Sequence, residues 1–279
     1  MFKIEENKIA YYENEKELAY VTYPIIYDRI VNINHTVVDP LLQGRGIASK
    51  LLEYAYNEIK AKGLKAELSC SYAISWFNKH SNYQDILTSG IRKYHEADFA
   101  RVYQITKDHW ENEVPMSLEL ANFIYDFLVR YYLYYNEYCY VGLEKGNVAA
   151  FLLANLKEET NDSFNYFKEN INKLNDNDKK LAYEYYDYIN YNHNKVLSYM
   201  PKNSIYLGLI ASKIHGMGFK MIEYLKGVAL KNNVHEIYLW TDETCDYKYY
   251  EKLGCILLET YYISLYEKKL KTFIYKMNF

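Results

Sequence analysis

The chain is poor in residues that interrupt or cross-link a fold, with four prolines, eleven glycines and four cysteines among 279 residues. The cysteines are Cys70, Cys139, Cys245 and Cys255. No two of them have the C-x-x-C spacing that is typical of zinc sites and redox motifs. We therefore expect free thiols, with no disulfide framework and no metal centre.

Long apolar runs and an excess of basic residues are also missing. No apolar run is long enough to span a bilayer, which argues against a transmembrane helix. Residues 2–10 contain Glu and Lys, unlike the apolar core of a signal peptide. The net charge of -3 gives no basic field for nucleic acid. We predict a cytoplasmic bacterial protein that binds neither nucleic acid nor a membrane.

One local pattern occurs twice. Residues 35–52 read HTVVDPLLQGRGIASKLL, and residues 205–225 read IYLGLIASKIHGMGFKMIEYL. Each predicts a strand, a glycine-containing turn and an amphipathic helix. The first turn of a helix has unpaired N–H groups and partial positive charge, which together suit a pyrophosphate. The repetition indicates two sites for one kind of phosphorylated ligand.

The two turns supply backbone N–H groups, glycines and cations. The first turn is Gln43, Gly44, Arg45, Gly46, Ile47 and Ala48, and the second is Lys213, Ile214, His215, Gly216, Met217 and Gly218. The apolar helix faces that follow are Ile47, Leu51, Tyr54, Ala55 and Ile59, and then Ile222, Leu225 and Ala229. Arg45, Lys213 and Lys220 are candidates for charge-assisted bonds to phosphate. The alternative is an ordinary strand-to-helix turn, since neither sequence fits a Walker A or dinucleotide motif.

Both turns resemble the acetyl-CoA pyrophosphate loop of GNAT-type N-acetyltransferases, whose motif is Q/R-x-x-G-x-G/A. In the first turn Gln43, Gly46 and Ala48 match the motif. In the second, Lys213 replaces the Gln or Arg, which keeps a donor but loses the planar fork of arginine. The resemblance implies acetyl-CoA as the cofactor and an α/β (α+β) fold of two GNAT-type domains. Each would have a mixed twisted sheet, flanking helices and splayed central parallel strands.

Residues 1–88 resemble the small GNAT-like domains of bacteria and plants. The likeness rests on the turn, on the strand His35-Thr36-Val37-Val38 and on residues 70–83, and it implies that Val37 and Val38 lie along the cofactor. We expect strands at residues 2–6, 8–12, 19–23 and 29–38. His35 is a candidate base because histidine is a common general base, although a structural hydrogen bond is the favoured interpretation.

Cys70 ends a strand that we expect at residues 66–70, just before a helix. In the family it lies near the thioester, which makes it a candidate nucleophile or acyl relay. A helix N-terminus lowers the pKa of a thiol and so increases its reactivity. The alternative interpretation is a small buried apolar residue.

Residues 90–279 resemble a full-length GNAT domain. The opening strand Ile91–Tyr94 precedes helices at about 98–110 and 118–135, separated by Pro115, and a hairpin at 138–156. Residues 249–255, Tyr-Tyr-Glu-Lys-Leu-Gly-Cys, resemble the family signature F-Y-E-K-L-G-F, with Cys255 in the place of an aromatic residue. Strands at 256–266 and 269–276 are expected to close the sheet.

An insert at residues 157–202 interrupts this second resemblance. It is too long for a bare loop, and Asp162 and Asp176 are candidate N-caps of two helices. Its tyrosines include Tyr183, Tyr185, Tyr186, Tyr188 and Tyr191. They predict an aromatic lid or substrate wall, or they only pack the helices, because the chain has 35 tyrosines in all.

The resemblance also implies a mechanism. Strands 205–210 and 235–240 would splay apart, and the backbone of the first, with Leu209 and Ile210, would bind the pantetheine arm. An amine attacks the thioester directly, a base removes a proton from the amine, and an acid protonates the leaving thiolate. Tyr250 matches the acid position, although a packed aromatic is the alternative role. Asp242 and Glu243 are candidates for the base or for helix capping, and His215 is assigned to cofactor contact.

The sequence therefore predicts a tandem N-acetyltransferase that moves an acetyl group from acetyl-CoA to a primary amine of a small molecule or protein. A homodimer is compatible with it. One alternative makes one domain a non-catalytic acyl-CoA sensor or protein-interaction module. Another makes the first domain an acyl carrier through Cys70. The pattern of residues does not identify the acceptor, because this fold serves many amines.

Overall fold

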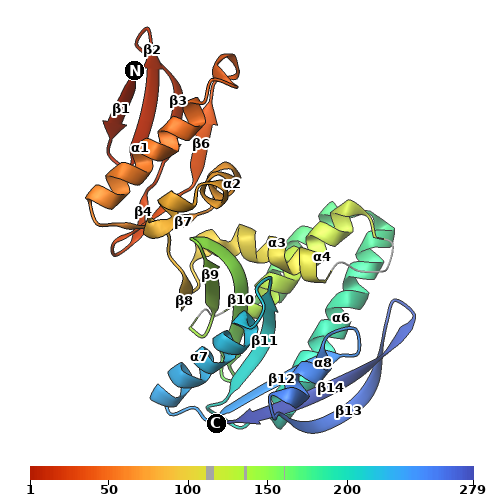
Figure 1. The fold of residues 1–279 in the computed structure, drawn as a ribbon. Helices are drawn as coiled ribbons and strands as arrows, with labels where there is room; N and C mark the ends of the chain where they lie inside the picture. Colours follow the sequence, from red (N-terminus) through yellow and green to blue (C-terminus); the bar gives the residue numbers. More distant parts are fainter. Residues whose placement is uncertain (111–115, 135–136, 160) are drawn as a thin grey trace. The chain divides into compact units, whose positions relative to one another are not determined.

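The structure, a computed structural model, describes residues 1–110, 116–134, 137–159 and 161–279, so Pro115 lies outside the described residues (Figure 1). The chain divides into two compact units: unit 1 is residues 1–90 with 143–149, and unit 2 is residues 91–142 with 150–279. Both units combine helices with sheets, which confirms the mixed α/β class. Within the described ranges, no helix is both long and apolar enough to cross a bilayer.

Unit 1 contains two small sheets. Its elements are β1 (Phe2–Glu5), β2 (Lys8–Glu13), β3 (Lys16–Thr22), β4 (Ile25–Tyr27), β5 (Ile30–Ile33), β6 (His35–Val38), α1 (Ile47–Ala61), β7 (Lys65–Leu68) and α2 (Ser71–Lys79). Short 3₁₀ helices lie at Pro40–Leu42 and Ser81–Ile86. The strand orders are β1-β2-β3-β6, all antiparallel, and β4-β5-β7. The expectation of one mixed sheet was wrong here, because Asn34 separates β5 from β6 and the two strands join different sheets.

The core of unit 1 lies under α1. Ile47, Leu51, Ala55 and Ile59 are buried, as their spacing predicts. Tyr54 was assigned to that face wrongly: it is 41% exposed and stacks on the ring of Phe2 at 4.8 Å.

A hairpin tip from the second half of the sequence completes unit 1. The N–H of Leu68 donates to the carbonyl of Gly146 at 2.7 Å, and the N–H of Gly146 donates to the carbonyl of Thr88 at 2.6 Å. Lys145 and Gly146 both have positive φ, as a two-residue hairpin turn requires. A Cβ on Gly146 would lie 3.0 Å from the carbonyl oxygen of Ala66, so this close approach needs glycine.

Unit 2 contains a seven-stranded sheet of order β13-β14-β12-β11-β10-β9-β8. Its strands are β8 (Gly90–Lys93), β9 (Tyr140–Glu144), β10 (Asn147–Leu156), β11 (Ile205–Ser212), β12 (Glu236–Asp242), β13 (Ile256–Leu265) and β14 (Lys268–Asn278). Its helices are α3 (Phe99–His109), α4 (Leu118–Tyr132), α5 (Ser163–Asn170), α6 (Asp176–Tyr199), α7 (Met217–Lys231) and α8 (Tyr247–Lys252), with 3₁₀ helices at Glu96–Asp98 and Ile171–Lys173. In this sheet β11 and β12 run parallel, whereas β10 with β11, β12 with β14 and β13 with β14 run antiparallel.

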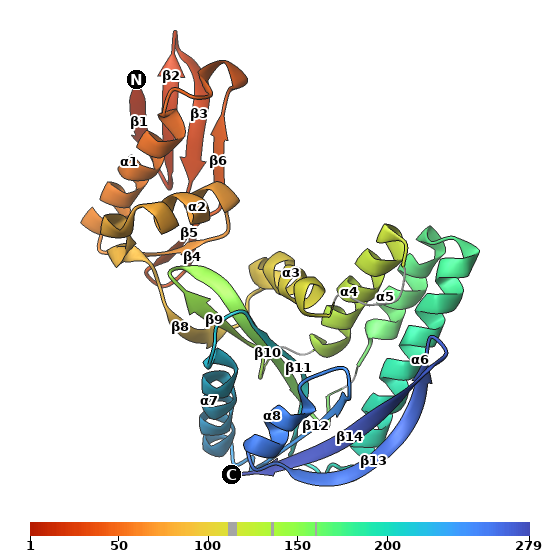
Figure 2. The same cartoon turned by 45° about the vertical axis from the view of Figure 1, so that its right-hand side comes forward.

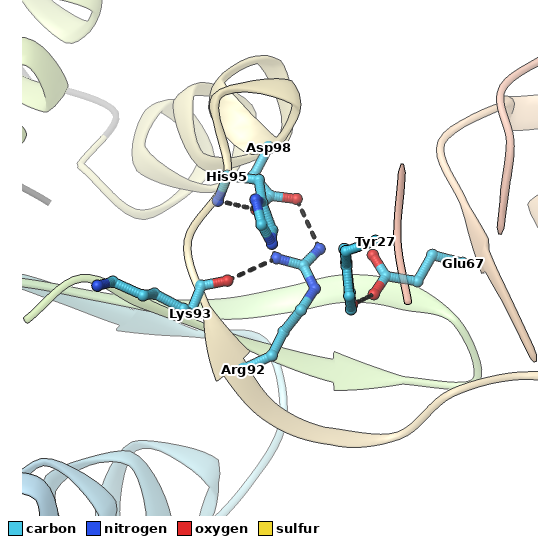
Figure 3. Close-up of polar contacts among 6 residues, drawn as sticks. All are labelled: Tyr27, Glu67, Arg92, Lys93, His95 and Asp98. Carbon is cyan, nitrogen blue, oxygen red and sulfur yellow. Dashed lines mark hydrogen bonds and ion pairs between the residues drawn. The ribbon is translucent and has the colours of Figure 1, made fainter. Parts of the chain in front are cut away.

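Polar side chains connect neighbouring elements at the start of unit 2 and, separately, inside unit 1 (Figure 3). In unit 2 the guanidinium of Arg92 donates to both oxygens of Asp98 at 2.7 and 2.8 Å, and the N–H of His95 donates to Asp98 Oδ2 at 2.8 Å. Asp98 thereby ties β8 to the turn that starts α3. In unit 1 the hydroxyl of Tyr27 donates to the buried carboxylate of Glu67.

The predicted insert forms α5 and α6, with two corrections at their starts. Asn175, not Asp176, caps α6, because its side chain accepts from the N–H of Asp178 at 3.0 Å. Asp162 precedes α5, but its side chain makes no capping bond, and Asn161 Oδ1 accepts from the N–H of Ser163 instead.

A β-bulge places Gly208 under the ring of Tyr132. The antiparallel register of β10 and β11 shifts between Leu153 and Ala154, which leaves Gly208 unmatched on β11. A Cβ on Gly208 would lie 2.1 Å from Tyr132 Cδ1, so the ring and the strand touch only because this residue is glycine.

Next to this bulge lies a buried histidine on α6. His193 is 5% exposed, and its ring contacts the rings of Tyr131 and Tyr206 at 5.3 and 4.9 Å. Among the described residues, nothing hydrogen-bonds its Nδ1. Burial lowers the pKa of His193 to about 4, so the imidazole is neutral at neutral pH.

We predict that Gly208→Ala destabilises unit 2 by about 1–3 kcal/mol, because the new methyl group displaces Tyr132 or the strand. The matched control is Gly227→Ala in α7, where a Cβ meets nothing within 4 Å. That change should be neutral or stabilising by about 0.5–1 kcal/mol. Urea unfolding measures both variants, and equal stabilities would contradict the close contact.

We also predict that His193 makes unit 2 sensitive to acid. The pKa of His193 is about 4 in the folded protein and 6.5 in the unfolded chain. Between these pH values the unfolded chain binds a proton at His193 and the folded protein does not. Stability attributable to His193 is therefore complete above pH 6.5 and falls by about 3 kcal/mol as the pH drops to about 4.

The measurement compares wild type with His193→Phe, which keeps a ring between the two tyrosines. Urea unfolding at pH 7 and pH 4.5 gives, for each protein, the change in the free energy of unfolding between the two pH values. The contributions of the other titrating groups cancel when the two changes are compared. Wild type should lose more stability than the variant. An identical pH dependence would show that His193 is not buried as a neutral ring.

Candidate active site

The first glycine turn forms an open, positively polarised helix start. Gly46 has φ 73° and directly precedes α1, and no side chain caps this helix. The first helical bond runs from the N–H of Lys50 to the carbonyl of Gly46. Among the described residues, the N–H groups of residues 46–49 therefore have no acceptor. A Cβ on Gly44 or Gly46 would meet nothing within 4 Å, so the space in front of the turn is free.

The strand that leads into this turn has a free edge. β6 pairs with β3 on one side and ends its sheet, and Val37 on it is 43% exposed, with Val38 partly buried. Cys70 directly precedes α2 and is half-buried, and its thiol lies 3.5 Å from the hydroxyl of Thr36 on β6. The exposed His35 lies on the same strand. The structure thus brings Cys70 to the free edge that the turn continues.

The second glycine turn repeats this geometry at the start of α7. Gly216 has φ 76°, nothing lies within 4 Å of a Cβ placed there, and its carbonyl accepts the first helical bond, from the N–H of Lys220. Unlike the first turn, this one has an occupied N–H group, because Met217 donates to the carbonyl of Ile214 at 3.2 Å. His215 and Gly216 are exposed, while Met217 and Gly218 are partly buried.

Lys213 differs from Arg45 in its surroundings. Its ammonium forms an ion pair with Asp108 of α3, whose pKa it lowers by a hydrogen bond. Arg45 is 60% exposed and lies 4.0 Å from Glu13, at the limit of an ion pair. The second turn therefore offers less free positive charge than the first.

Two parallel strands diverge directly in front of the second turn. β11 and β12 pair only through Ile205 with Ile237 and Tyr206 with Tyr238 (Figure 2). Beyond these pairs, β11 remains paired with β10 and β12 with β14. Residues 207–212 include Leu209 and Ile210. Among the described residues, no strand pairs with the backbone edge of this segment on the β12 side. The divergence that the sequence predicts is present in unit 2.

Tyr250 lies on α8, the short helix that follows β12. It is partly buried, burial raises its pKa above the ordinary value, and a charge interaction with Cys245 adds to the rise. A raised pKa keeps the phenol protonated, as an acid requires. The hydroxyl of Tyr249 is buried with no hydrogen-bond partner among the described residues, and it lies 3.6 Å from a Cβ placed on Gly218.

The two candidate bases have different environments. Asp242 is buried, and its oxygens accept hydrogen bonds from Tyr188 Oη at 2.6 Å, Thr244 N–H at 2.8 Å and the Thr244 hydroxyl. Glu243 is exposed, and its Oε1 accepts from the N–H of Lys271 at 2.8 Å. Within the described part of the chain, no residue bonds its other oxygen, so Glu243 keeps a free acceptor and Asp242 does not.

The sequence did not identify three side chains that surround the divergence. Tyr188, His193 and Trp240 lie on the face of the sheet that α6 covers, with Tyr188 and Trp240 in ring contact at 5.5 Å. Tyr188 was one of several tyrosines in the insert, and nothing in its local sequence distinguished it. The available signal in the sequence was helical spacing: the residues of α6 that are buried recur at about every third or fourth position.

Comparison with known proteins gives one family match. Residues 7–86 match the model of the GCN5-related N-acetyl-transferase family. No curated protein matches the chain significantly.

Solved acetyltransferase structures are also similar to this chain. A GCN5-like putative N-acetyltransferase from Staphylococcus aureus is 31% identical, with 34% of this chain and 93% of that chain covered and a TM-score of 0.29. A Drosophila melanogaster polyamine N-acetyltransferase that forms N-acetylagmatine is 12% identical, with coverages of 68% and 99% and a TM-score of 0.45. The putative acetyltransferase yncA from Salmonella typhimurium, solved with its cofactor acetyl-CoA, is 14% identical, with coverages of 68% and 94% and a TM-score of 0.39. The family match supports the GNAT superfamily for residues 7–86.

Proposed function

We propose that the chain is a tandem N-acetyltransferase in which each unit has an acetyl-CoA site and unit 2 acetylates a primary amine. One observation supports this most: the same constellation occurs in both units. A glycine with positive φ opens each helix, and a strand with a free edge leads into that glycine. Among the described residues, N–H groups in the first turn of each helix lack an acceptor, except that of Met217 in unit 2, which donates to the carbonyl of Ile214. The family match over residues 7–86 supports the proposal for the first copy.

The residues present fit the donor. The open space at Gly44, Gly46 and Gly216 admits a pyrophosphate, and the unpaired N–H groups behind it are suitable donors. The free edge of β11, with Leu209 and Ile210, suits the amides of a pantetheine arm, and Val37 and Val38 on β6 suit the arm in unit 1. Bound acetyl-CoA would supply an acetyl group activated as a thioester.

In unit 2 the proton transfers fall to two side chains. Glu243 keeps a free carboxylate oxygen at the end of β12 and is the proton acceptor for the ammonium form of the substrate, which has no lone pair until it loses a proton. Tyr250 holds a proton on its hydroxyl for the departing sulfur, and its raised pKa keeps it protonated. Asp242, with both oxygens occupied, is not proposed as the base.

The ion pair of Lys213 with Asp108 favours a second candidate, in which one unit binds acyl-CoA without catalysis. In that case the turn with the occupied lysine would bind the donor weakly or not at all. A third possibility is an acyl carrier at Cys70, because its thiol lies at the free edge of β6. Mass spectrometry after rapid mixing with acetyl-CoA tests it, and an unchanged mass of Cys70 would exclude this role.

We predict that calorimetry finds two coenzyme A sites in the wild type and one in each of Gly46→Glu and Gly216→Glu. The new carboxylate occupies and repels the space that a phosphate needs. Gly254→Glu is the control, because this glycine also has positive φ in open space but lies outside both turns. A single site in the wild type would mean that only one unit binds coenzyme A, and the variant that abolishes binding would identify that unit. No binding at all would refute the acetyl-CoA proposal.

We predict that Tyr250→Phe lowers kcat about 10²-fold or more while the affinity for acetyl-CoA changes little, because the variant loses a proton donor but keeps the ring. The control is Tyr247→Phe on the same helix, whose ring stacks on Phe273 at 4.5 Å. Steady-state kinetics with a panel of primary amines measures both variants. An unchanged kcat for Tyr250→Phe would remove it from the mechanism.

A further inference from the structure

The inserted helix α6 reaches both of the strands that diverge. Toward β12, Tyr188 Oη donates to the buried carboxylate of Asp242 at 2.6 Å, and the Tyr188 ring contacts Trp240. Toward β11, the ring of His193 packs on Tyr206 at 4.9 Å. Tyr188 and His193 are more than one helical turn apart, so one helix contacts the two strands at separate points.

A direct bond also crosses between the strands on this face. Trp240 Nε1 donates to Tyr206 Oη at 2.8 Å. Tyr206 is in the last residue pair that joins β11 to β12, and Trp240 lies two residues beyond its own last pair. Beyond that point the strand pairings end, and the remaining links across the divergence are made by side chains.

We propose that α6 is a brace that sets the separation of β11 and β12, and that Tyr188 is a positioning residue that acts through Asp242. This inference rests on the proposed function, because the separation matters if a donor arm lies against the free edge of β11. Asp242 then has a structural task that explains its three hydrogen bonds. Through Thr244, the same carboxylate also orders the turn that carries Cys245, whose N–H donates to the carbonyl of Asp242.

The proposal distinguishes two parts of coenzyme A. The nucleotide and pyrophosphate depend on the Gly216 turn and not on the strand separation. The arm depends on the free edge of β11. Weakening the brace should therefore lower the affinity for the whole molecule and leave the affinity for a nucleotide fragment unchanged.

The experiment uses the full chain carrying Gly46→Glu, so that unit 2 holds the remaining site. Tyr188→Phe removes one hydrogen bond to a carboxylate while keeping the ring. The matched control is Tyr199→Phe, which removes a hydrogen bond from the same helix to Glu259 on β13, away from the divergence. Calorimetry measures coenzyme A and adenosine 3′,5′-bisphosphate with each protein.

Tyr188→Phe should weaken coenzyme A binding about three- to tenfold, and Tyr199→Phe should not. Binding of the bisphosphate should stay within about twofold for both variants, because this ligand does not use the free edge of β11. An unchanged affinity of Tyr188→Phe for coenzyme A would overturn the brace, as would an equal loss for both ligands.

A second readout is independent of the donor. Hydrogen exchange of the amides of residues 207–212 should become faster in Tyr188→Phe and remain unchanged in Tyr199→Phe, because the strand loses its support. If the parent protein binds no coenzyme A, the proposed function fails and this exchange alone decides the brace. Equal exchange in all three proteins would then refute it.

Discussion

The arrangement of unit 2 depends on one constraint, which is that β11 and β12 pair through only two residue pairs before they separate. Backbone N–H and C=O groups need partners, so an unfilled strand edge inside a sheet is costly unless water or a ligand fills it. The neighbouring strands β10 and β14 hold the outer edges of the pair. The two faces are covered by α7 on one side and by α4 and α6 on the other. An opening of this kind persists because the surrounding packing maintains it.

Short-range features of this fold could be predicted from the sequence, because their causes are local. Gly46 and Gly216 open α1 and α7 at the expected positions, since glycine adopts positive φ without strain. The helix faces followed the 3.6-residue period, with Tyr54 as the exception, because an aromatic residue at the edge of an apolar stripe can stack outside it. The cap of α6 was displaced by one residue, since Asn175 and Asp176 are equally good capping residues and only the geometry chooses between them.

Contacts between distant residues could not be predicted in the same way. Gly146 completes unit 1 from more than fifty residues away, and a glycine in a hairpin turn carries no sign of the partner that approaches it. Tyr188 and Asp242 are 54 residues apart. Because the chain has 35 tyrosines, its sequence does not indicate which of them donates to a buried carboxylate. Asp242 was a candidate base because of its place at the end of β12. Its partners, which that place does not encode, decide its chemistry.

An acid next to a reaction centre can act as a base or as an anchor, and the number of its hydrogen bonds separates the two roles. The carboxylate of Asp242 accepts three hydrogen bonds in a buried site, so its partners hold it in place and neither of its oxygens is left without a bond. Glu243, one residue further on, is exposed and has a free oxygen. In the proposed mechanism, an anchor and a proton acceptor therefore follow one another at the end of β12. The anchor has a partner because the insert brings α6 to that strand, which gives the extra helix a role in the site without requiring it to touch the substrate.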